Sequence, residues 1–216
     1  NFFIENINAI PEISIEFVDI ILPIGISFFT FQQIAYLVDV YRKSAKEYSI
    51  LDYCVFVTFF PQLIAGPIVH HKQVMPQFAS AGNRQLNWFN IDRGVFIFAL
   101  GLFKKIVIAD TLAKWANEGF GAASSLNFFE SWVAVLSYTF QLYFDFSGYS
   151  DMAIGLARMF GIRLPLNFNS PYKAENIIEF WRRWHITLGR FITSYLYTPI
   201  SIILFRFSIL RQHGTI

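Results

Sequence analysis

The chain has 216 residues, of which 55% are hydrophobic, 19% aromatic and only 15% charged, and its formal net charge is +2. Soluble domains average about 25% charged residues, so this composition, with a mean hydropathy of +0.43, excludes a soluble globular domain and indicates a membrane protein. The 26 phenylalanines exclude a disordered chain. The single cysteine, Cys54, excludes a disulfide framework, and the small net charge predicts no nucleic-acid partner.

Both ends of the sequence suggest that it is an internal segment. The chain begins at Asn1 without an initiator methionine, and its first residues lack the basic region of a signal peptide. It stops at Ile216, shortly after an apolar run. We therefore expect residues 1–216 to form one integral-membrane domain that is truncated at both ends.

Charge-free runs locate the predicted membrane spans, because a helix needs about 20 mostly apolar residues to cross the hydrocarbon core. The predicted spans are Ile20–Val38, Tyr53–Val69, Gly94–Ala109, Ser131–Phe144 and Phe191–Phe205, and all but Gly94–Ala109, which contains two lysines, are free of charge. They predict an all-α, polytopic transmembrane fold. No repeat of fixed period is visible along the chain.

Three of these spans contain features that should distort them. Pro61 and Gly66-Pro67 predict a kinked or re-entrant second span. Lys104 and Lys105 lie inside the third span, and we expect their side chains to snorkel toward an interface. The fourth span should end in a turn at Ser147–Tyr149, which leads into a short amphipathic segment at 151–160.

The segment from Glu175 to Ile192 carries the most informative candidate, His185. At 100° per residue the segment reads as one amphipathic helix, with His185 on its apolar face between Trp181 and Trp184. An imidazole with an ordinary pKa near 6.5 suits general-base chemistry on a hydroxyl. The alternative is a core histidine that is hydrogen bonded to a neighbouring carbonyl.

Four charged residues nearby are candidates for supporting roles. Asp145 and Asp151 could orient a catalytic group such as His185, or they could belong to a polar cluster that closes helix contacts. Arg182 and Arg183 occupy the polar side of the predicted helix. They could bind the phosphates of a nucleotide-like donor, or they could anchor the helix at the membrane interface.

A metal site is not expected. His70 and His71 are adjacent, and neighbouring residues of a helix point about 100° apart. No Asp or Glu stands at ligand spacing from them along the chain, and Cys54 is distant. We interpret the two histidines as interfacial.

Long stretches of the sequence resemble the membrane-bound O-acyltransferases, and most of all the branch with the alginate O-acetyltransferase membrane subunit. These stretches are Leu22–Arg42, Phe59–Phe78 and Phe140–Pro199. The resemblance implies a multi-span fold around a membrane tunnel, through which a donor acyl group from the cytoplasmic side reaches an acceptor outside.

The same resemblance assigns a role to His185. The family's active-site histidine in a WRRWH-type motif corresponds to His185, and Trp181 and Trp184 would line the tunnel. A second family histidine lies in a Leu-Trp-His-Gly-like segment further downstream, and His213 lacks that context. If the downstream histidine is the base, His185 lines the tunnel without abstracting the proton.

The resulting functional prediction is an O-acyltransferase of the inner membrane. It would transfer an acyl group, most simply acetyl, from acetyl-CoA or another acyl thioester to hydroxyls of an exported polysaccharide such as alginate. No bound cofactor is expected. The resemblance also implies a periplasmic or extracellular acetyltransferase as partner. Teichoic acid, peptidoglycan and other glycans are alternative acceptors. The alternative outside the enzymes is a membrane transporter, whose helices would be broken at Pro23 and Pro61.

Overall fold

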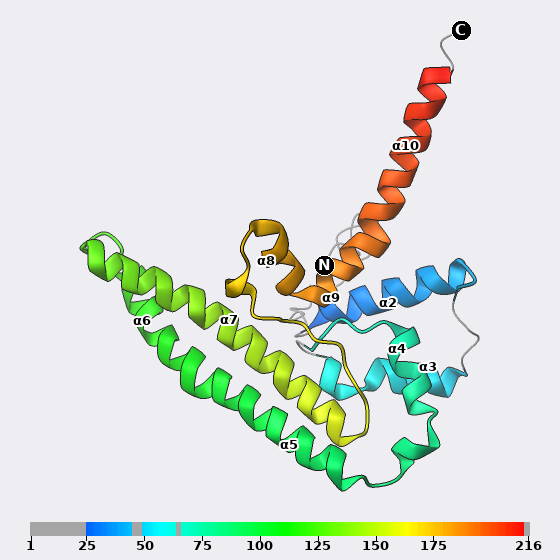
Figure 1. Ribbon diagram of the computed structural model, residues 1–216, viewed down its shortest axis with the longest axis horizontal. Coiled ribbons are helices and arrows are strands. Elements are labelled where there is room, and N and C mark those ends of the chain that lie inside the picture. The colour runs from blue at the N-terminus through cyan, green and yellow to red at the C-terminus, as the bar shows by residue number, and fades with distance from the viewer. Residues whose placement is uncertain (1–24, 45–48, 64–65, 214–216) are drawn as a thin grey trace, which may run out of the picture.

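The computed structural model describes residues 25–44, 49–63 and 66–213, and these residues form helices joined by loops, without strands (Figure 1). The predicted all-α fold is therefore confirmed for this part of the chain. The α-helices are α2 (Ile26–Tyr41), α3 (Ile50–Thr58), α4 (His71–Phe78), α5 (Trp88–Phe103), α6 (Asp110–Gly121), α7 (Phe128–Met159), α8 (Ile177–Arg183), α9 (Ile186–Phe191) and α10 (Thr198–His213). Shorter elements are the 3₁₀-helices η1 (Phe60–Gln62), η2 (Ala81–Arg84) and η4 (Pro171–Lys173) and the π-helices η3 (Lys104–Ala109) and η5 (Ile192–Tyr197).

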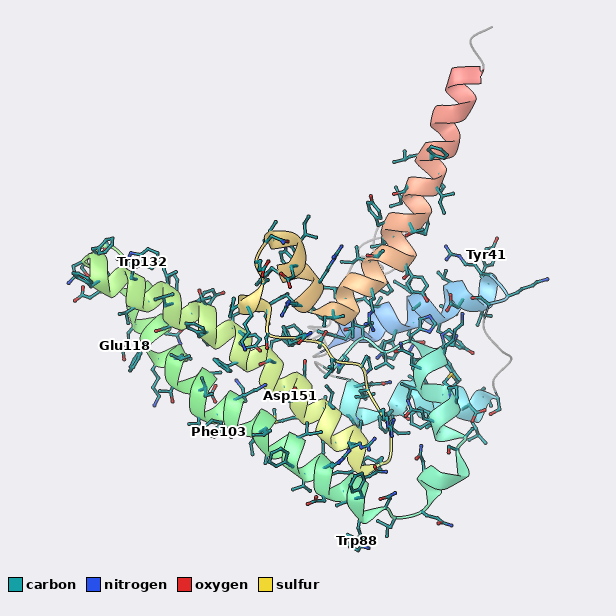
Figure 2. The ribbon with its side chains drawn as sticks, viewed as in Figure 1. Tyr41, Trp88, Phe103, Glu118, Trp132 and Asp151 are labelled. Atoms are coloured by element: carbon teal, nitrogen blue, oxygen red, sulfur yellow. The ribbon has the colours of Figure 1, made fainter. Side chains whose placement is uncertain are left out.

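A pair of long antiparallel helical rods forms one arm of the molecule. One rod is α5, η3 and α6 in succession, and the other is α7, which packs along it (Figure 1). In Figure 2, Trp88 marks one end of the arm, and Glu118 and Trp132 mark the other. The predicted turn at Ser147–Tyr149 is wrong, because α7 continues to Met159 without a break. The small residues of this stretch pack against the neighbouring rod and do not end the helix.

Glycines set the close approach of the two rods. A Cβ on Gly101 would lie 2.6 Å from the carbonyl oxygen of Gly148, and a Cβ on Gly94 would lie 2.7 Å from that of Gly155. Backbones in contact through small residues are typical of helices packed in membranes. The two glycine pairs therefore fix the register of α5 against α7.

Two lysines of η3 face α7 and do not reach out to an interface. Lys104 Nζ lies 2.6 Å from Asp151 Oδ2, and Lys105 Nζ lies 2.6 Å from Asp145 Oδ1. The prediction that these lysines snorkel is wrong, because each one finds a carboxylate on the adjacent rod. Ionisable groups at membrane depth are normally paired in this way.

The second predicted span is broken where its prolines suggested. Helix α3 ends at Thr58, and Pro61 lies within the single 3₁₀ turn η1. The described chain then runs without helix through Pro67 to His70, where α4 begins. Next to α4 lies a small apolar core, to which the end of α7 and the loop after it contribute: Val69, Val74, Ala157, Ile162 and Leu164.

One helical stretch in the described residues is long and apolar enough to cross a membrane, from Ile186 to Phe205. It covers the predicted span Phe191–Phe205 and begins earlier. Residues 20–24 of the first predicted span lie outside the described part of the chain. Large apolar side chains such as Phe103 and Trp132 are each 53% exposed, as expected for surfaces that face lipid or further protein. The multi-pass arrangement stays a prediction.

Candidate active site

His185 lies at a break between two helices and not in the middle of one. Helix α8 ends at Arg183, and α9 begins at Ile186. Between them the backbone of His185 adopts the left-handed conformation, with φ 44° and ψ 53°. The prediction of a single amphipathic helix over 175–192 is therefore wrong. A non-glycine residue in this conformation needs support from its surroundings.

That support comes from the loop that precedes α8. The carbonyl oxygen of Asn167 accepts a hydrogen bond from Ile186 N at 2.9 Å, and its Oδ1 accepts from Thr187 Oγ1 at 2.9 Å and Thr187 N at 3.4 Å. On the other side of the break, Asn169 N donates to the carbonyl oxygen of Arg183 at 2.9 Å. The loop therefore holds the chain on both sides of His185.

The Asn167 contact is itself anchored to the rest of the fold. Thr187 Oγ1 accepts from Ile68 N at 3.0 Å, and Asn167 Nδ2 donates to Ser150 Oγ on α7 at 3.4 Å. Asn167, Thr187 and Ser150 are all buried. Sequence reasoning missed this network. Nothing in the sequence distinguishes Asn167 from Asn169.

Phenylalanines, and not indoles, surround the imidazole of His185. The ring of Phe146 stands edge-on at a centroid distance of 4.8 Å, and Phe28 and Phe168 lie at 6.0 and 6.5 Å. The expectation that Trp181 and Trp184 flank His185 is wrong, because the helix break turns the imidazole away from them.

The chemical state of His185 follows from this apolar setting. Its Nε2 is buried and has no hydrogen-bond partner among the residues that the structure describes. Burial lowers the pKa of the imidazole to about 4, since removal from water disfavours the charged form. At neutral pH the ring is therefore uncharged, which is the form that can accept a proton.

The two tryptophans occupy different environments. Trp184 stacks on Phe180 at 5.7 Å and meets Phe168 edge-on at 5.1 Å, within an aromatic cluster that includes Tyr143. Trp181 is 60% exposed. A tunnel-lining role for either indole stays a prediction.

The two arginines, Arg182 and Arg183, also make different contacts. Arg183 forms an ion pair with Glu179 one turn earlier in α8. Arg182 lines an open pocket of about 530 Å³ whose other lining residues are Trp181, Ile186, Gly189, Arg190, Thr193 and Ser194. The pocket thus combines two guanidinium groups with an indole, beside the helix that follows His185.

Asp145 and Asp151 are engaged with lysines. Each carboxylate binds one lysine of η3, as described above, and His185 Nε2 has no partner in the described residues. The hypothesis that either aspartate holds the tautomer of His185 is not supported by this geometry. Both aspartates instead join the two rods of the arm.

A second polar cluster forms around Asp39 at the end of α2. Its Oδ2 lies 2.8 Å from His70 Nε2, 3.8 Å from His71 Nε2 and 3.7 Å from Lys72 Nζ, and it accepts a hydrogen bond from Tyr195 Oη at 3.1 Å. The interpretation of the histidines as interfacial is wrong for His71, which is buried. Although no carboxylate stands at ligand spacing along the chain, α2 brings Asp39 next to the pair.

The hydrogen bond to His70 Nδ1 favours a hydrogen-bonded cluster over a metal centre. The possible ligand atoms of Asp39, His70 and His71 lie within 4.8 Å of one another. However, His70 Nδ1 accepts a bond from Lys72 N at 3.3 Å, which leaves the ring proton on Nε2, the atom that faces Asp39. Burial lowers the pKa of His70 despite the nearby carboxylate. Burial also raises the pKa of Asp39, but the Tyr195 hydrogen bond together with His70, Lys72 and His71 outweighs burial and holds that pKa below its usual value.

Comparison with known proteins identifies the family. The membrane-bound O-acyltransferase family matches residues 39–213. The chain belongs to this family. This assignment favours the acyltransferase interpretation over the transporter alternative, and it agrees with the resemblance seen in the sequence.

Relatives within the family carry out acyl transfer on several polymers, according to their names. The chain is 53% identical to a peptidoglycan O-acetyltransferase of Helicobacter pylori, with 93% of this chain and 43% of the relative covered. It is 46% identical to a probable alginate O-acetylase, AlgI, of Pseudomonas aeruginosa (84% and 34% covered). It is 27% identical to a teichoic acid D-alanyltransferase of Streptococcus thermophilus (89% and 47% covered). The chain thus spans less than half the length of each of these relatives.

Proposed function

We propose that the whole protein transfers an acyl group, most simply acetyl, from a thioester donor to a hydroxyl of a glycan outside the cytoplasm, with His185 in the active site. The observation that carries this proposal is the buried Nε2 of His185, which has no protein partner in the described residues and lies on an uncharged ring. A buried polar atom without a partner costs about 1–3 kcal/mol. Such an atom is expected where a substrate group completes the hydrogen bonding.

The reaction requires one proton acceptor close to the attacking oxygen. The acceptor hydroxyl donates to the free imidazole nitrogen of His185, and its oxygen attacks the thioester carbonyl carbon. The new C–O bond forms as the C–S bond breaks, and the proton passes from the imidazole to the departing sulfur as a thiol. General-base assistance of this kind contributes about 10²–10⁴-fold to a rate.

The donor side of the proposal uses the pocket beside α9. Arg182 and Arg190 would bind the phosphates of acetyl-CoA or of another acyl thioester that carries phosphate, and Trp181 would cover an apolar part of the donor. The guanidinium of Arg183 is committed to Glu179, so we assign it no donor contact.

For the acceptor, the names of the relatives define the polymers to test. They act on peptidoglycan, alginate and teichoic acid, and we propose that this protein modifies a glycan of the same kind. The setting we propose is a multi-pass protein of the inner membrane with a tunnel past His185. A periplasmic or extracellular acetyltransferase would complete delivery to the polymer.

A reconstituted reaction tests the proposal. The full-length protein in proteoliposomes receives acetyl-CoA and peptidoglycan or alginate oligosaccharides, and acetyl esters on each glycan are quantified by mass spectrometry. We expect ester formation by the wild type and by His70→Gln, and a loss of at least 100-fold in His185→Ala. Transfer at the wild-type rate by His185→Ala would contradict the role of His185. Absence of transfer by the wild type to either glycan, both without and with periplasmic extract of the parent cells as a source of the partner, would contradict the proposed reaction.

A further inference from the structure

Helix α9 is capped from outside, by Asn167, and not by the residue at its own N-cap position. A helix leaves its first backbone N–H groups without partners, and the side chain of the N-cap residue usually accepts from one of them. His185 occupies the N-cap of α9 but makes no such bond. The N–H groups of Ile186 and Thr187 donate instead to the carbonyl oxygen and to Oδ1 of Asn167.

The same chain contains a histidine that does cap its helix. His70 is the N-cap of α4, its backbone is extended with φ −85° and ψ 131°, and its Nδ1 accepts from Lys72 N at 3.3 Å. An N-cap histidine in this fold can therefore use a ring nitrogen for its own helix. His185 differs in having a left-handed backbone, and the N–H that it would cap is already bonded to Asn167.

We infer that Asn167 is the positioning residue of the active site: it takes over the capping of α9 and so leaves the imidazole of His185 free to face substrate. Thr187 is its partner, because its hydroxyl donates to Asn167 Oδ1 at 2.9 Å and accepts from Ile68 N at 3.0 Å. This inference rests on the proposed function of His185.

The left-handed backbone of His185 explains why the hydrogen bonds from the loop before α8 are needed. A non-glycine residue in the left-handed region is strained and persists only where its neighbours hold it. Here the carbonyl of Arg183 is held by Asn169, and the residues after the break are held by Asn167. Both asparagines come from one loop, so the loop before α8 fixes the orientation of the imidazole.

Loss of the Asn167 side chain has a definite structural consequence. The N–H and hydroxyl of Thr187 lose their acceptor in a buried site. We expect the ring of His185, which stands at the N-cap position of α9, to turn back and cap that helix as His70 caps α4. The imidazole would then be withdrawn from the reacting hydroxyl. A misplacement of about 1 Å in an active site costs up to about 100-fold in rate.

The test compares kcat and donor KM of the full-length protein in proteoliposomes, with acetyl-CoA and glycan oligosaccharides as probes. Asn167→Ala and Thr187→Val should lower kcat by about 10- to 100-fold, with KM for acetyl-CoA unchanged within about twofold. Thr187→Ser keeps the hydroxyl and should retain most of the wild-type kcat. Thr58→Val is the matched control, since the Thr58 hydroxyl is exposed, donates to Cys54 O of its own helix and lies outside the donor pocket.

A second readout reports the imidazole directly. The rate at which diethyl pyrocarbonate modifies His185, followed by mass spectrometry, should change in Asn167→Ala and Thr187→Val and stay at the wild-type value in Thr187→Ser. Wild-type kcat and wild-type modification in Thr187→Val would overturn the inference, even if Asn167→Ala fails to fold. If His185→Ala itself keeps full activity, the proposed function fails, and the modification rate of His185 in Thr187→Val still decides whether Asn167 and Thr187 position the imidazole.

Discussion

The close approach of the two rods leads to a sharp prediction for Gly101. In Gly101→Ala the new Cβ would lie 2.6 Å from the carbonyl oxygen of Gly148 and 2.6 Å from the backbone nitrogen of Met152. Ordinary van der Waals contact begins at 3.4 Å, so the atoms are too close by about 0.8 Å. Both obstacles are backbone atoms of α7. Relief therefore requires the rods to separate, and no side chain can simply rotate away.

The change in the free energy of unfolding caused by Gly101→Ala has two opposing contributions. Forcing an extra methyl group into a packed interface costs about 1–3 kcal/mol. Alanine gains about 0.8–1 kcal/mol over glycine in a helix interior, which offsets part of that cost. Separation of the rods would also stretch the nearby contact between Lys104 and Asp151, which is 2.6 Å long. We expect Gly101→Ala to be destabilising overall.

Gly121→Ala is the matched control for this substitution. Gly121 closes α6, and nothing lies within 4 Å of a Cβ built on it. Thermal unfolding of the full-length protein in detergent should show a lower melting temperature for Gly101→Ala than for Gly121→Ala. Equal melting temperatures for the two variants would refute the packing argument.

Three further predictions concern charges. Lys105→Met leaves Asp145 without its cation and should lower the yield of folded protein, and the double variant with Asp145→Asn should recover it, with a coupling energy of about 0.5–3 kcal/mol from unfolding measurements. Purely additive losses would contradict the pairing. Arg182→Ala should raise the KM for acetyl-CoA severalfold with little change in kcat, whereas Arg183→Ala should change KM less; the reverse order would contradict the donor pocket. Because burial lowers the pKa of His185 to about 4, the reactive neutral ring is lost only as the pH falls through that value, so the pH–rate profile should have its acid limb below about pH 5. An acid limb near pH 6.5 would contradict a buried imidazole.

The sequence predicted those features of the fold that depend on composition and on proline. The low charge content indicated a membrane protein, and Pro61 marked the break after α3 correctly. It failed where tertiary contacts overrode local signals. Ser147 and Gly148 resemble turn residues, but they are buried in an uninterrupted α7 because small residues let the other rod approach.

Tertiary contacts also explain why the sequence identified His185 but predicted its surroundings wrongly. The residue type of His185 and its family resemblance identified it as the candidate, but helical periodicity placed it among tryptophans on one continuous helix. The residues after the break are hydrogen bonded to Asn167, which is 18 positions earlier in the chain than His185. No local pattern reports a contact of that kind. The carboxylate of Asp39 beside His70 and His71 was missed for the same reason.

The central claim is that His185 serves acyl transfer, and the O-acetyl content of cell-surface glycans in the parent cells tests it most directly. Wild type, His185→Ala and His70→Gln are compared at matched membrane abundance, and ester-linked acetate is measured on purified peptidoglycan and exopolysaccharide. We predict loss of acetate in His185→Ala alone, with polymer export unchanged. Normal acetylation in His185→Ala, or loss of the polymer itself, would contradict the account.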